Sequence, residues 1–304
     1  MRKLAIVGAG KVGTVLGRIF VDNGGQVVSV VSRTQKSAGI AGRFLHCRNV
    51  SDSLASIPPS TELIYITTPH AAVEGVALGL SRLDHLAFRK LSVCHASGML
   101  TAKALAPLSK RGATVFSFHP LQTFPRDFKA RDIVPTARGL YYAVDGSARG
   151  LRVARQFARR LDGRIIQIKP AMRVFYHAAC VVASNHLTAM LSVLDTMYRR
   201  FDKNEKDFFR VFKPIITATL YNIERTSPAE ALSGPVARGG VETVAGHLSA
   251  IKQFAPDLLP YFGTLTLETV RLAERKGSIT DDRALALRKL VRSFVPDSQT
   301  KERH

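Results

Sequence analysis

Two side chains that can move a proton follow two predicted strands. His119 comes after the apolar run ATVFSF and before Pro120, which restricts His119 to extended backbone conformations. An imidazole with a pKa of about 6.5 serves as a hydrogen-bond donor or as a proton source near neutral pH. Ser97 ends the other strand, LSVCHASG, so we expect it to hydrogen-bond one ring nitrogen of His119. A structural His119 that only turns the chain is the alternative.

A second polar set lies in the apolar segment YHAACVVASNHL, residues 176–187. Because His177 and Ser184 are seven residues apart, an α-helix would place them on one face, with Asn185 roughly 80° away and His186 opposite. Polar groups in so apolar a helix need partners, either in a core or in a ligand cleft. We therefore treat them as candidates for substrate contact or proton transfer.

A lone arginine, Arg238, stands in the glycine-flanked stretch ALSGPVARGG. A guanidinium can form two parallel hydrogen bonds with a carboxylate. In a cleft, Arg238 would bind the carboxylate of a small anionic substrate. Outside a cleft, it would cap the preceding helix.

The segment GAGKVG has the G-x-G-x-x-G spacing, directly after the apolar run LAIV and before a helical pattern. The first glycine permits a tight turn, and the second lets the backbone approach a pyrophosphate. The third glycine packs the helix on the strand, so that the helix N-terminus faces the phosphates. We therefore predict that a dinucleotide binds here, at Gly8, Ala9, Gly10, Lys11, Val12 and Gly13.

The residues after the second predicted strand, QVVSVV, indicate which dinucleotide binds. An Asp or Glu about 20 residues past the glycines would read the ribose hydroxyls of NAD. This sequence has Ser32, Arg33 and Thr34 there, and a guanidinium pairs with a 2′-phosphate. The pattern favours NADP(H). A solvated arginine in a basic protein is the alternative.

The elements that position these residues follow from the hydrophobic pattern. Residues 1–168 alternate strands with helices, which predicts an α/β fold with a doubly wound parallel sheet of the Rossmann type. Ligands of such a sheet bind outside the carboxyl ends of the strands. The strand ELIYI ends there in Thr67, Thr68 and Pro69, which we also assign to the cofactor site. Residues 169–304 have helical periodicity almost throughout, so we predict an all-α substrate-binding and dimerisation domain after a boundary near residue 168.

Composition limits the class of protein. The net charge is +21, of which residues 1–168 carry +15 (24 Lys+Arg, 9 Asp+Glu) and residues 169–304 carry +6 (20 and 14). The basic residues are scattered and not interleaved with aromatic residues, so we expect a solvated basic surface that attracts anionic ligands and not a nucleic-acid site. No uninterrupted apolar run approaches the roughly 20 residues that span a bilayer. The three cysteines and nine histidines match no metal-ligand spacing, and we expect no metal, no membrane and a cytoplasmic location.

Together, the glycine loop, the SRT turn, HASG, FHPLQTF, the YHAA…SNHL helix and GPVARGG resemble a family of predicted NADP-dependent oxidoreductases over nearly the whole chain. Its members join a Rossmann domain to an all-helical C-terminal domain of poorly characterised function. The wider 6-phosphogluconate dehydrogenase-like superfamily includes ketopantoate reductase, pyrroline-5-carboxylate reductase and prephenate dehydrogenase.

The resemblance to prephenate dehydrogenase implies roles for single residues. His119 matches the histidine of its His-Pro motif, which contacts the reacting oxygen with support from a serine at the place of Ser97. His177, Ser184 and Arg238 resemble its helix histidine and serine and its carboxylate-binding arginine. The sequence departs from this family where a second helix histidine is replaced around Thr188. It departs from ketopantoate reductase by lacking the helix lysine, and from its nearer kin by Gly240 in place of an aspartate.

These observations predict an NADPH-dependent reductase of a small carboxylated 2-oxo compound, with 2-dehydropantoate (ketopantoate) as the first candidate. His119 or His177 would supply the proton, and the other would orient the substrate with Asn185. Arg238 and Ser184 would bind the substrate. The resemblance also implies a homodimer. The alternatives are a dehydrogenase of the prephenate or arogenate type and an NADP-binding sensor protein without turnover.

Overall fold

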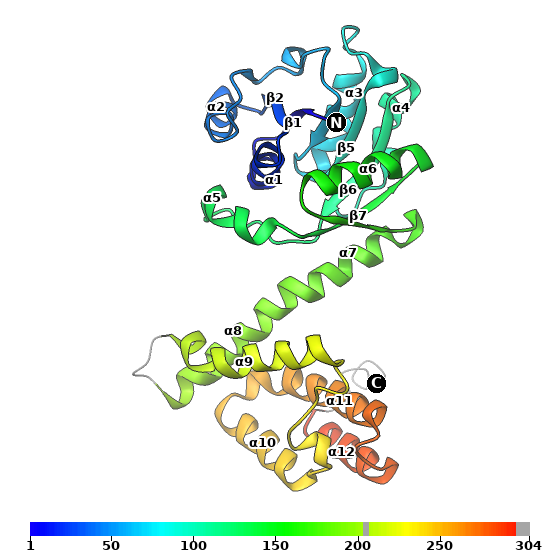
Figure 1. Cartoon of the computed structure of the whole chain (residues 1–304). Helices are drawn as coiled ribbons and strands as arrows, with labels where there is room; N and C mark the ends of the chain where they lie inside the picture. The colour runs from blue at the N-terminus through cyan, green and yellow to red at the C-terminus, as the bar shows by residue number, and fades with distance from the viewer. Residues whose placement is uncertain (203–206, 296–304) are drawn as a thin grey trace, which may run out of the picture. The chain divides into compact units, whose positions relative to one another are not determined.

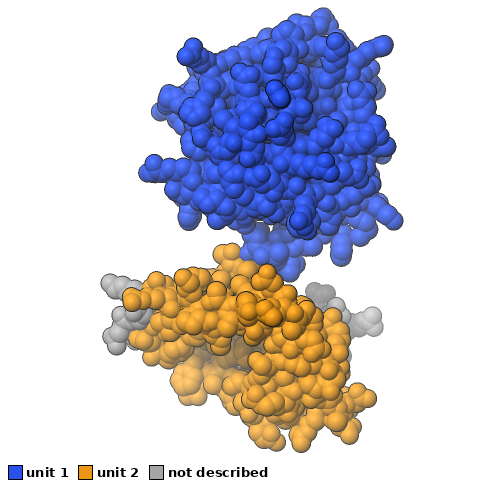
Figure 2. All heavy atoms as spheres, viewed as in Figure 1, with its two compact units in different colours: residues 1–186 blue, residues 187–304 orange. Residues whose placement is uncertain are grey.

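The computed structural model describes residues 1–202 and 207–295. The chain forms two compact units, residues 1–186 and residues 187–304 (Figures 1 and 2). The first unit contains all eight strands of the sheet, and the second is helical. An α/β unit followed by a helical unit confirms the predicted fold class.

The first unit is built on one sheet with the strand order β3-β2-β1-β4-β5-β6-β7-β8. The strands are β1 (Lys3–Val7), β2 (Gln26–Val31), β3 (Val50–Ser51), β4 (Leu63–Ile66), β5 (Ser92–His95), β6 (Thr114–Pro120), β7 (Tyr141–Gly146) and β8 (Arg164–Gln167). All neighbours are parallel except β6 and β7, which run antiparallel. The predicted doubly wound parallel sheet is thus confirmed except at this pair. The chain returns after β6 through residues 121–137 without crossing the sheet, so β7 runs back beside β6.

Helices cover both faces of this sheet (Figure 1). They are α1 (Lys11–Asp22), α2 (Gln35–Phe44), α3 (Val73–Ser81), α4 (Ala106–Lys110), α5 (Ala130–Ile133) and α6 (Ala148–Arg160). The central strands are apolar on both sides because each face packs against helices, and Leu4, Ile6 and Ile64 are completely buried. In α6, Leu151, Ala154 and Phe157 face the core at helical spacing while the arginines point outward.

The end of the first unit differs from the predicted boundary at residue 168. The strands do end at Gln167, and a helix begins soon after, at α7 (Arg173–Val181). The compact unit nevertheless continues to His186, because α7 begins with a buried side chain, Arg173, that contacts the sheet. The change in secondary structure and the change in packing therefore fall at different residues.

The helix that starts with α7 is not uniformly α-helical. Residues Val182–His186 form a π-helical turn before α8 (Leu187–Phe201). A π turn advances fewer degrees per residue than an α turn. The angles predicted for Ser184 and Asn185 relative to His177 assumed uniform α spacing, and the π turn changes them.

By length and composition alone, one helix among the described residues could cross a membrane, the run Pro170–Phe201. Its length and mean hydropathy are sufficient although polar residues such as His177 and Asn185 interrupt its sequence. A core or interface helix of a protein in water has the same composition, so this feature is weak evidence for a membrane.

The second unit packs three helices around its own core: α10 (Val241–Phe254), α11 (Leu259–Lys276) and α12 (Asp281–Phe294). Leu248, Val270 and Leu287 from these helices are completely buried. The preceding helix, α9 (Phe208–Arg225), buries no residue and exposes apolar side chains, including Ile215 at 64%. Its apolar surface is therefore available for a further contact.

Candidate active site

The glycine loop lies at the point where the strand order reverses, between β1 and β4. Gly8 has φ +111°, and a Cβ there would lie 2.7 Å from the backbone carbon of Thr67. A Cβ on Gly13 would lie 2.4 Å from Oγ1 of Thr67, whose hydroxyl donates to the carbonyl of Gly8 at 2.6 Å. Gly8 and Gly13 thus serve the close approach of β4 and α1.

The surroundings of Gly10 differ from those of Gly8 and Gly13. No atom lies within 4 Å of the position that its Cβ would take. This open side faces a ligand space at the carboxyl edge of the sheet, where the N-terminus of α1 directs its backbone N–H groups. The side of the loop that a pyrophosphate would approach is therefore clear.

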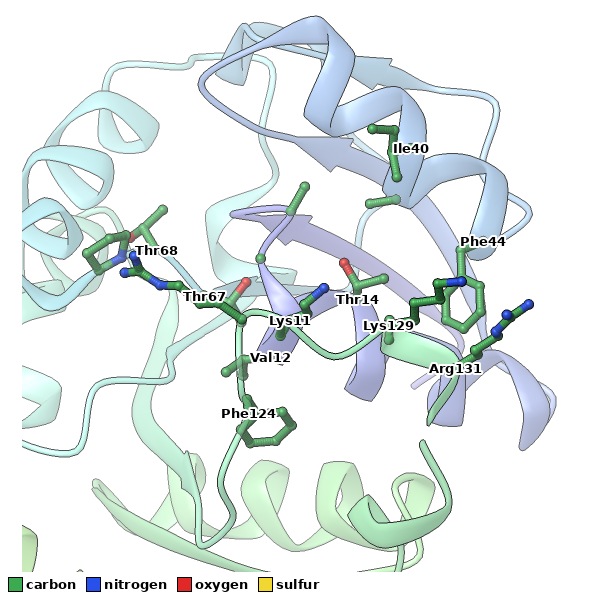
Figure 3. Close-up of a pocket in the computed structure, with 16 residues that line it drawn as sticks. Lys11, Val12, Thr14, Ile40, Phe44, Thr67, Thr68, Phe124, Lys129 and Arg131 are labelled. Carbon is green, nitrogen blue, oxygen red and sulfur yellow. The ribbon is translucent and has the colours of Figure 1, made fainter. Parts of the chain in front are cut away.

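A pocket of about 800 Å³ opens at this loop (Figure 3). It is lined by Ala9, Gly10, Lys11, Val12, Thr14, Ile40, Ala41, Phe44, Thr67, Thr68, Pro69, Phe124, Arg126, Lys129, Ala130 and Arg131. Seven of these were assigned to the cofactor from the sequence, from the glycine loop and the turn after β4. Thr68 also has a buried hydroxyl oxygen without a hydrogen-bond partner in the described part of the chain, which suits a polar ligand group.

The opposite wall of the pocket comes from the 121–137 segment, which the sequence analysis missed. Its part around α5 packs against α1 and brings Lys129 and Arg131 close to Phe44 of α2 (Figure 3). Together with Lys11 and Arg126 the lining has four cations and no carboxylate. The run PRDFKAR directly after the His-Pro strand was the available signal, because its three cations fall within six residues.

The predicted 2′-phosphate turn stands outside this lining. Arg33 is exposed and forms no salt bridge within residues 1–202 and 207–295. Thr34 is the N-cap of α2, and its hydroxyl oxygen accepts from the backbone N–H of Ser37 at 3.2 Å. Ser32 continues the sheet pairing, with its N–H bonded to the carbonyl of Ser51. Arg33 is the member of the turn whose side chain is free to meet an anion.

His119 lies on β6 beyond the end of β5, since β5 ends with His95 opposite Ser117. At this position β6 has only β7 as a neighbour, which is why Pro120 is tolerated in the strand. The Nδ1 atom of His119 lies 2.7 Å from the hydroxyl of Tyr176 on α7. The hydrogen bond to Tyr176 of α7 therefore orients the His119 ring at the end of β6.

His177 completes this group. The rings of His119 and His177 lie 6.1 Å apart between centroids. A Cβ on Gly98 would lie 3.0 Å from Nε2 of His119, 3.1 Å from Nε2 of His177 and 2.3 Å from Cδ2 of His177. The two histidines predicted from the sequence are thus brought together, over a glycine that leaves room for both rings.

The predicted hydrogen bond between Ser97 and His119 is wrong. Both residues are described, and His119 pairs with Tyr176 instead. The hydroxyl oxygen of Ser97 accepts from the backbone N–H groups of Met99 and Leu100 at 3.3 and 3.1 Å. The chain turns sharply after β5, and Ser97 satisfies the amide groups that the turn leaves unpaired.

A buried ion pair fixes α7 to the sheet. Arg173 and Asp145 are 1% and 3% exposed, with Nη1 3.6 Å from Oδ2. Arg173 also donates to the carbonyls of Ser97 at 2.9 Å and Ala143 at 3.3 Å, while Asp145 accepts from the hydroxyl of Ser117 at 2.5 Å. Because Tyr176 and His177 follow Arg173 by one helical turn, this pair determines where their side chains meet His119.

Burial keeps His95 and His119 neutral. The pKa of His119 is lowered to about 3, first by burial and then by the guanidinium of Arg173 and by His177. The pKa of His95 is lowered to about 4, mainly by burial, and its Nε2 faces the carbonyl of Thr101 at 3.0 Å. The pKa of Tyr176 is raised, with burial as the largest cause. At neutral pH His119 is therefore an uncharged imidazole beside a protonated phenol.

Within the described residues, no observed contact joins the remaining predicted substrate-binding residues to His119 or His177. Ser184 and Asn185 lie in the π-helical turn, and Asn185 is exposed. Arg238 is exposed at the end of a short 3-10 helix in the second unit, where Gly239 adopts φ +65°. Their roles in binding substrate stay predictions. Within the described residues no three His, Cys, Asp or Glu side chains are placed to hold a metal ion.

Comparison with known proteins assigns both parts of the chain. Residues 2–120 match the family described as a Rossmann-like domain. Residues 140–269 match the family described as a domain of unknown function (DUF2520). No protein of curated function matches the chain by sequence.

Three solved structures are similar in fold. A candidate NADP oxidoreductase from Bacteroides fragilis is 19% identical with a TM-score of 0.69, covering 90% of this chain and 98% of its own. A reductive aminase from Aspergillus terreus in complex with NADPH is 16% identical with a TM-score of 0.59, covering 98% and 95%. Prephenate dehydrogenase from A. aeolicus in complex with NAD⁺ is 16% identical with a TM-score of 0.53, covering 90% and 98%.

These similarities show a shared fold along nearly the whole chain, in agreement with the two family matches. The two family matches and the shared fold thus agree on a Rossmann-like domain followed by a C-terminal part that matches DUF2520.

Proposed function

We propose that the protein binds NADP(H) in the pocket at the glycine loop and acts as an NADP-dependent oxidoreductase. The observation that carries this proposal is the pocket itself, which combines the open side of Gly10 with four cationic side chains. A dinucleotide phosphate carries its negative charge on the pyrophosphate and the 2′-phosphate. Structures similar in fold contain NADPH or NAD⁺, which supports the same class of ligand here.

The cations divide into two groups by position. Lys11 stands at the start of α1, next to the expected pyrophosphate, and the 121–137 segment contributes Arg126, Lys129 and Arg131 from the facing wall. Arg33 follows β2, where the adenosine ribose lies in this fold, so it is our candidate for the 2′-phosphate. The weak pair of Arg131 with Asp132, at 3.7 Å and largely exposed, would not compete strongly with a phosphate.

The cofactor preference can be measured by isothermal titration with NADPH and NADH. We expect tighter binding of NADPH, and we expect Arg33→Ala to remove most of the difference. A lost charge-assisted pair costs about 1.5–3 kcal/mol, or roughly ten- to a hundredfold in affinity. The matched control is Arg152→Ala, an exposed arginine on α6 away from the pocket lining. Equal affinity of the unmodified protein for both cofactors would refute NADP(H) preference.

For the chemistry, we propose reduction of a small carboxylated 2-oxo compound, with 2-dehydropantoate as the first substrate to test. NADPH, when bound, supplies the hydride to the carbonyl carbon. His119 or His177 hydrogen-bonds the carbonyl oxygen and passes it a proton, and their proximity in the first unit supports this role. Arg238, with Ser184 and Asn185, would hold the carboxylate and orient the substrate.

A second candidate is oxidation of a cyclic acid of the prephenate type, which the fold similarity to prephenate dehydrogenase favours. Incubation with NADPH and a panel of 2-oxo acids, and separately with NADP⁺ and prephenate or arogenate, distinguishes the two directions. Consumption of NADPH supports the reductase, and formation of NADPH supports the dehydrogenase. Tight NADPH binding without turnover on either panel would favour a sensor protein.

We also propose that two copies associate. The helix α9 has no buried residue, and a second copy could cover some of its exposed apolar side chains, among them Ile215, Leu220 and Tyr221. Scattered apolar residues are normal on a protein surface, whereas a full helix without a buried residue is not. The proposal accords with the homodimer that the family resemblance implies.

A further inference from the structure

We propose that Tyr176 is a positioning residue that holds His119 as the Nε2–H tautomer, with Nε2 on the side of Gly98 and His177. The Tyr176 hydroxyl donates its hydrogen to Nδ1, so the remaining ring hydrogen is on Nε2. Sequence reasoning gave Tyr176 no role, and it assigned the orienting contact to Ser97. The tautomer determines whether His119 offers a hydrogen or a lone pair to a substrate oxygen.

The geometry leaves one side of the imidazole for a ligand. Nδ1 is occupied by Tyr176 at 2.7 Å. Nε2 of His119 and Nε2 of His177 converge on one point beside Gly98, at 3.0 and 3.1 Å from the position of an added Cβ. Neither Nε2 atom has a hydrogen-bond partner in the described part of the chain, whereas other polar side-chain atoms nearby are paired. Nε2 is therefore the ring nitrogen of His119 that remains available to a substrate oxygen.

The charges around Tyr176 favour the phenol as the donor. The guanidinium of Arg173 lies over the Tyr176 ring, 5.5 Å from its centroid, and it contacts the buried Asp145 from the sheet side. A positive charge beside a phenol strengthens its O–H as a hydrogen donor. Burial and the same guanidinium disfavour a charged imidazole, so His119 carries one ring hydrogen and needs a donor for its second nitrogen.

Arg173 also fixes the position of Tyr176 relative to His119. Its bonds to the carbonyls of Ser97 and Ala143 join the β5 turn, β7 and the first turn of α7. Tyr176 and His177 follow on the next helical turn, so their side chains are fixed relative to β6 by a buried element. A hydrogen bond held in this way keeps the ring from flipping.

The consequence for the reaction rests on the proposed function. When a carbonyl is reduced, its oxygen takes the hydrogen from Nε2 of His119 as the hydride reaches the carbon. Nδ1 takes the phenol hydrogen of Tyr176 at the same time, which avoids an anionic imidazole. Afterwards water supplies a proton to Nε2, and Nδ1 returns its hydrogen to the phenolate, so that one proton in total comes from water.

The test uses the full chain with ¹⁵N-labelled histidine and no ligand, so it does not depend on turnover. Two-bond ¹⁵N–¹H spectra distinguish a ring nitrogen that carries hydrogen from one that carries a lone pair. The His119 signals are identified by their loss in His119→Asn. We expect Nε2 to carry the hydrogen at pH 7 and Nδ1 to show the resonance of a hydrogen-bonded lone pair.

Removal of the phenol hydroxyl then identifies the donor. In Tyr176→Phe the Nδ1 resonance should move toward that of a lone pair without a donor, while thermal unfolding changes little. The control is Tyr141→Phe, an exposed tyrosine of β7, which should leave the His119 signals unchanged.

A hydrogen on Nδ1 in the unmodified protein would overturn the proposal, as would an Nδ1 resonance unaffected by Tyr176→Phe. The first measurement stands even where the variant does not fold. Failure of NADPH to bind would refute the proposed function without changing either spectrum, so the two failures are distinguishable.

Discussion

Replacing Arg173 by methionine should destabilise the first unit strongly, because it separates a buried ion pair. Methionine fills much of the same volume but leaves Asp145, which is 3% exposed, without its guanidinium. Asp145 would keep the hydroxyl of Ser117 and the backbone N–H of Ala102, at 2.5 and 2.7 Å. The carbonyls of Ser97 and Ala143 would lose their donors at the same time.

The magnitude follows from the burial of both partners. Removing one member of a buried pair costs about 3–5 kcal/mol, most of it from the uncompensated charge that stays behind. For a unit of this size, 1 kcal/mol shifts the midpoint of thermal unfolding by about 2–4 °C, so the expected loss is roughly 6–20 °C. Asp145→Asn combined with Arg173→Met removes the stranded charge and should recover a large part of this loss.

Differential scanning calorimetry of the full chain measures the midpoints, and hydrogen exchange shows whether β6 and β7 are the strands that open. A second readout is the pKa of His119, which Arg173 helps to lower and which should therefore rise in Arg173→Met. A loss below about 1 kcal/mol, or a double variant no more stable than Arg173→Met, would refute the view that this pair anchors α7.

Three further predictions follow from the same structure. Acidification should destabilise the first unit, because His95 and His119 have pKa values lowered to about 4 and about 3, so the unfolded chain binds protons first as pH falls below about 6.5. Each histidine then lowers the free energy of unfolding by up to about 1.4 kcal/mol per pH unit. Urea unfolding of His119→Gln at several pH values tests this, and the same pH dependence as in the unmodified protein would contradict it. Arg238→Lys should raise KM for a carboxylated substrate roughly ten- to a hundredfold with unchanged NADPH affinity, and an unchanged KM would exclude Arg238 as the carboxylate partner. The proposed dimer should appear in sedimentation velocity of the unmodified protein and be lost in Ile215→Glu, and a dimer that persists in this variant would place the interface elsewhere.

The glycine loop and the fold class could be predicted from the sequence because the interactions behind them are local. G-x-G-x-x-G after an apolar run requires only the turn at Gly8, the helix that starts at Lys11 and the strand before it. Alternation of strands and helices up to Gln167 likewise follows from hydrophobic period alone. The long helical segment after Pro170 could be predicted in the same way.

The partners of His119 could not be predicted in this way, since they depend on contacts between distant residues. Position in the sequence suggested Ser97, but Ser97 is used by its own turn. Tyr176 reaches His119 only because Arg173, on the same helix, is bound to Asp145 of β7. An ion pair between residues 28 positions apart leaves no periodic signal in either segment.

The pocket shows the same division between local pattern and tertiary contact. Its glycine wall was predicted residue by residue, whereas Arg126, Lys129 and Arg131 reach it because β7 runs antiparallel to β6 and the linking segment folds against α1. The packing of the linking segment on α1 therefore decides which cations line the pocket. The sequence by itself determined the glycine loop and its strand–turn–helix setting, and thereby the prediction of a dinucleotide, through short-range steric and hydrogen-bonding rules. Only the tertiary structure decided which side chains surround it, because burial and charge pairing act between residues that the chain brings together from far apart.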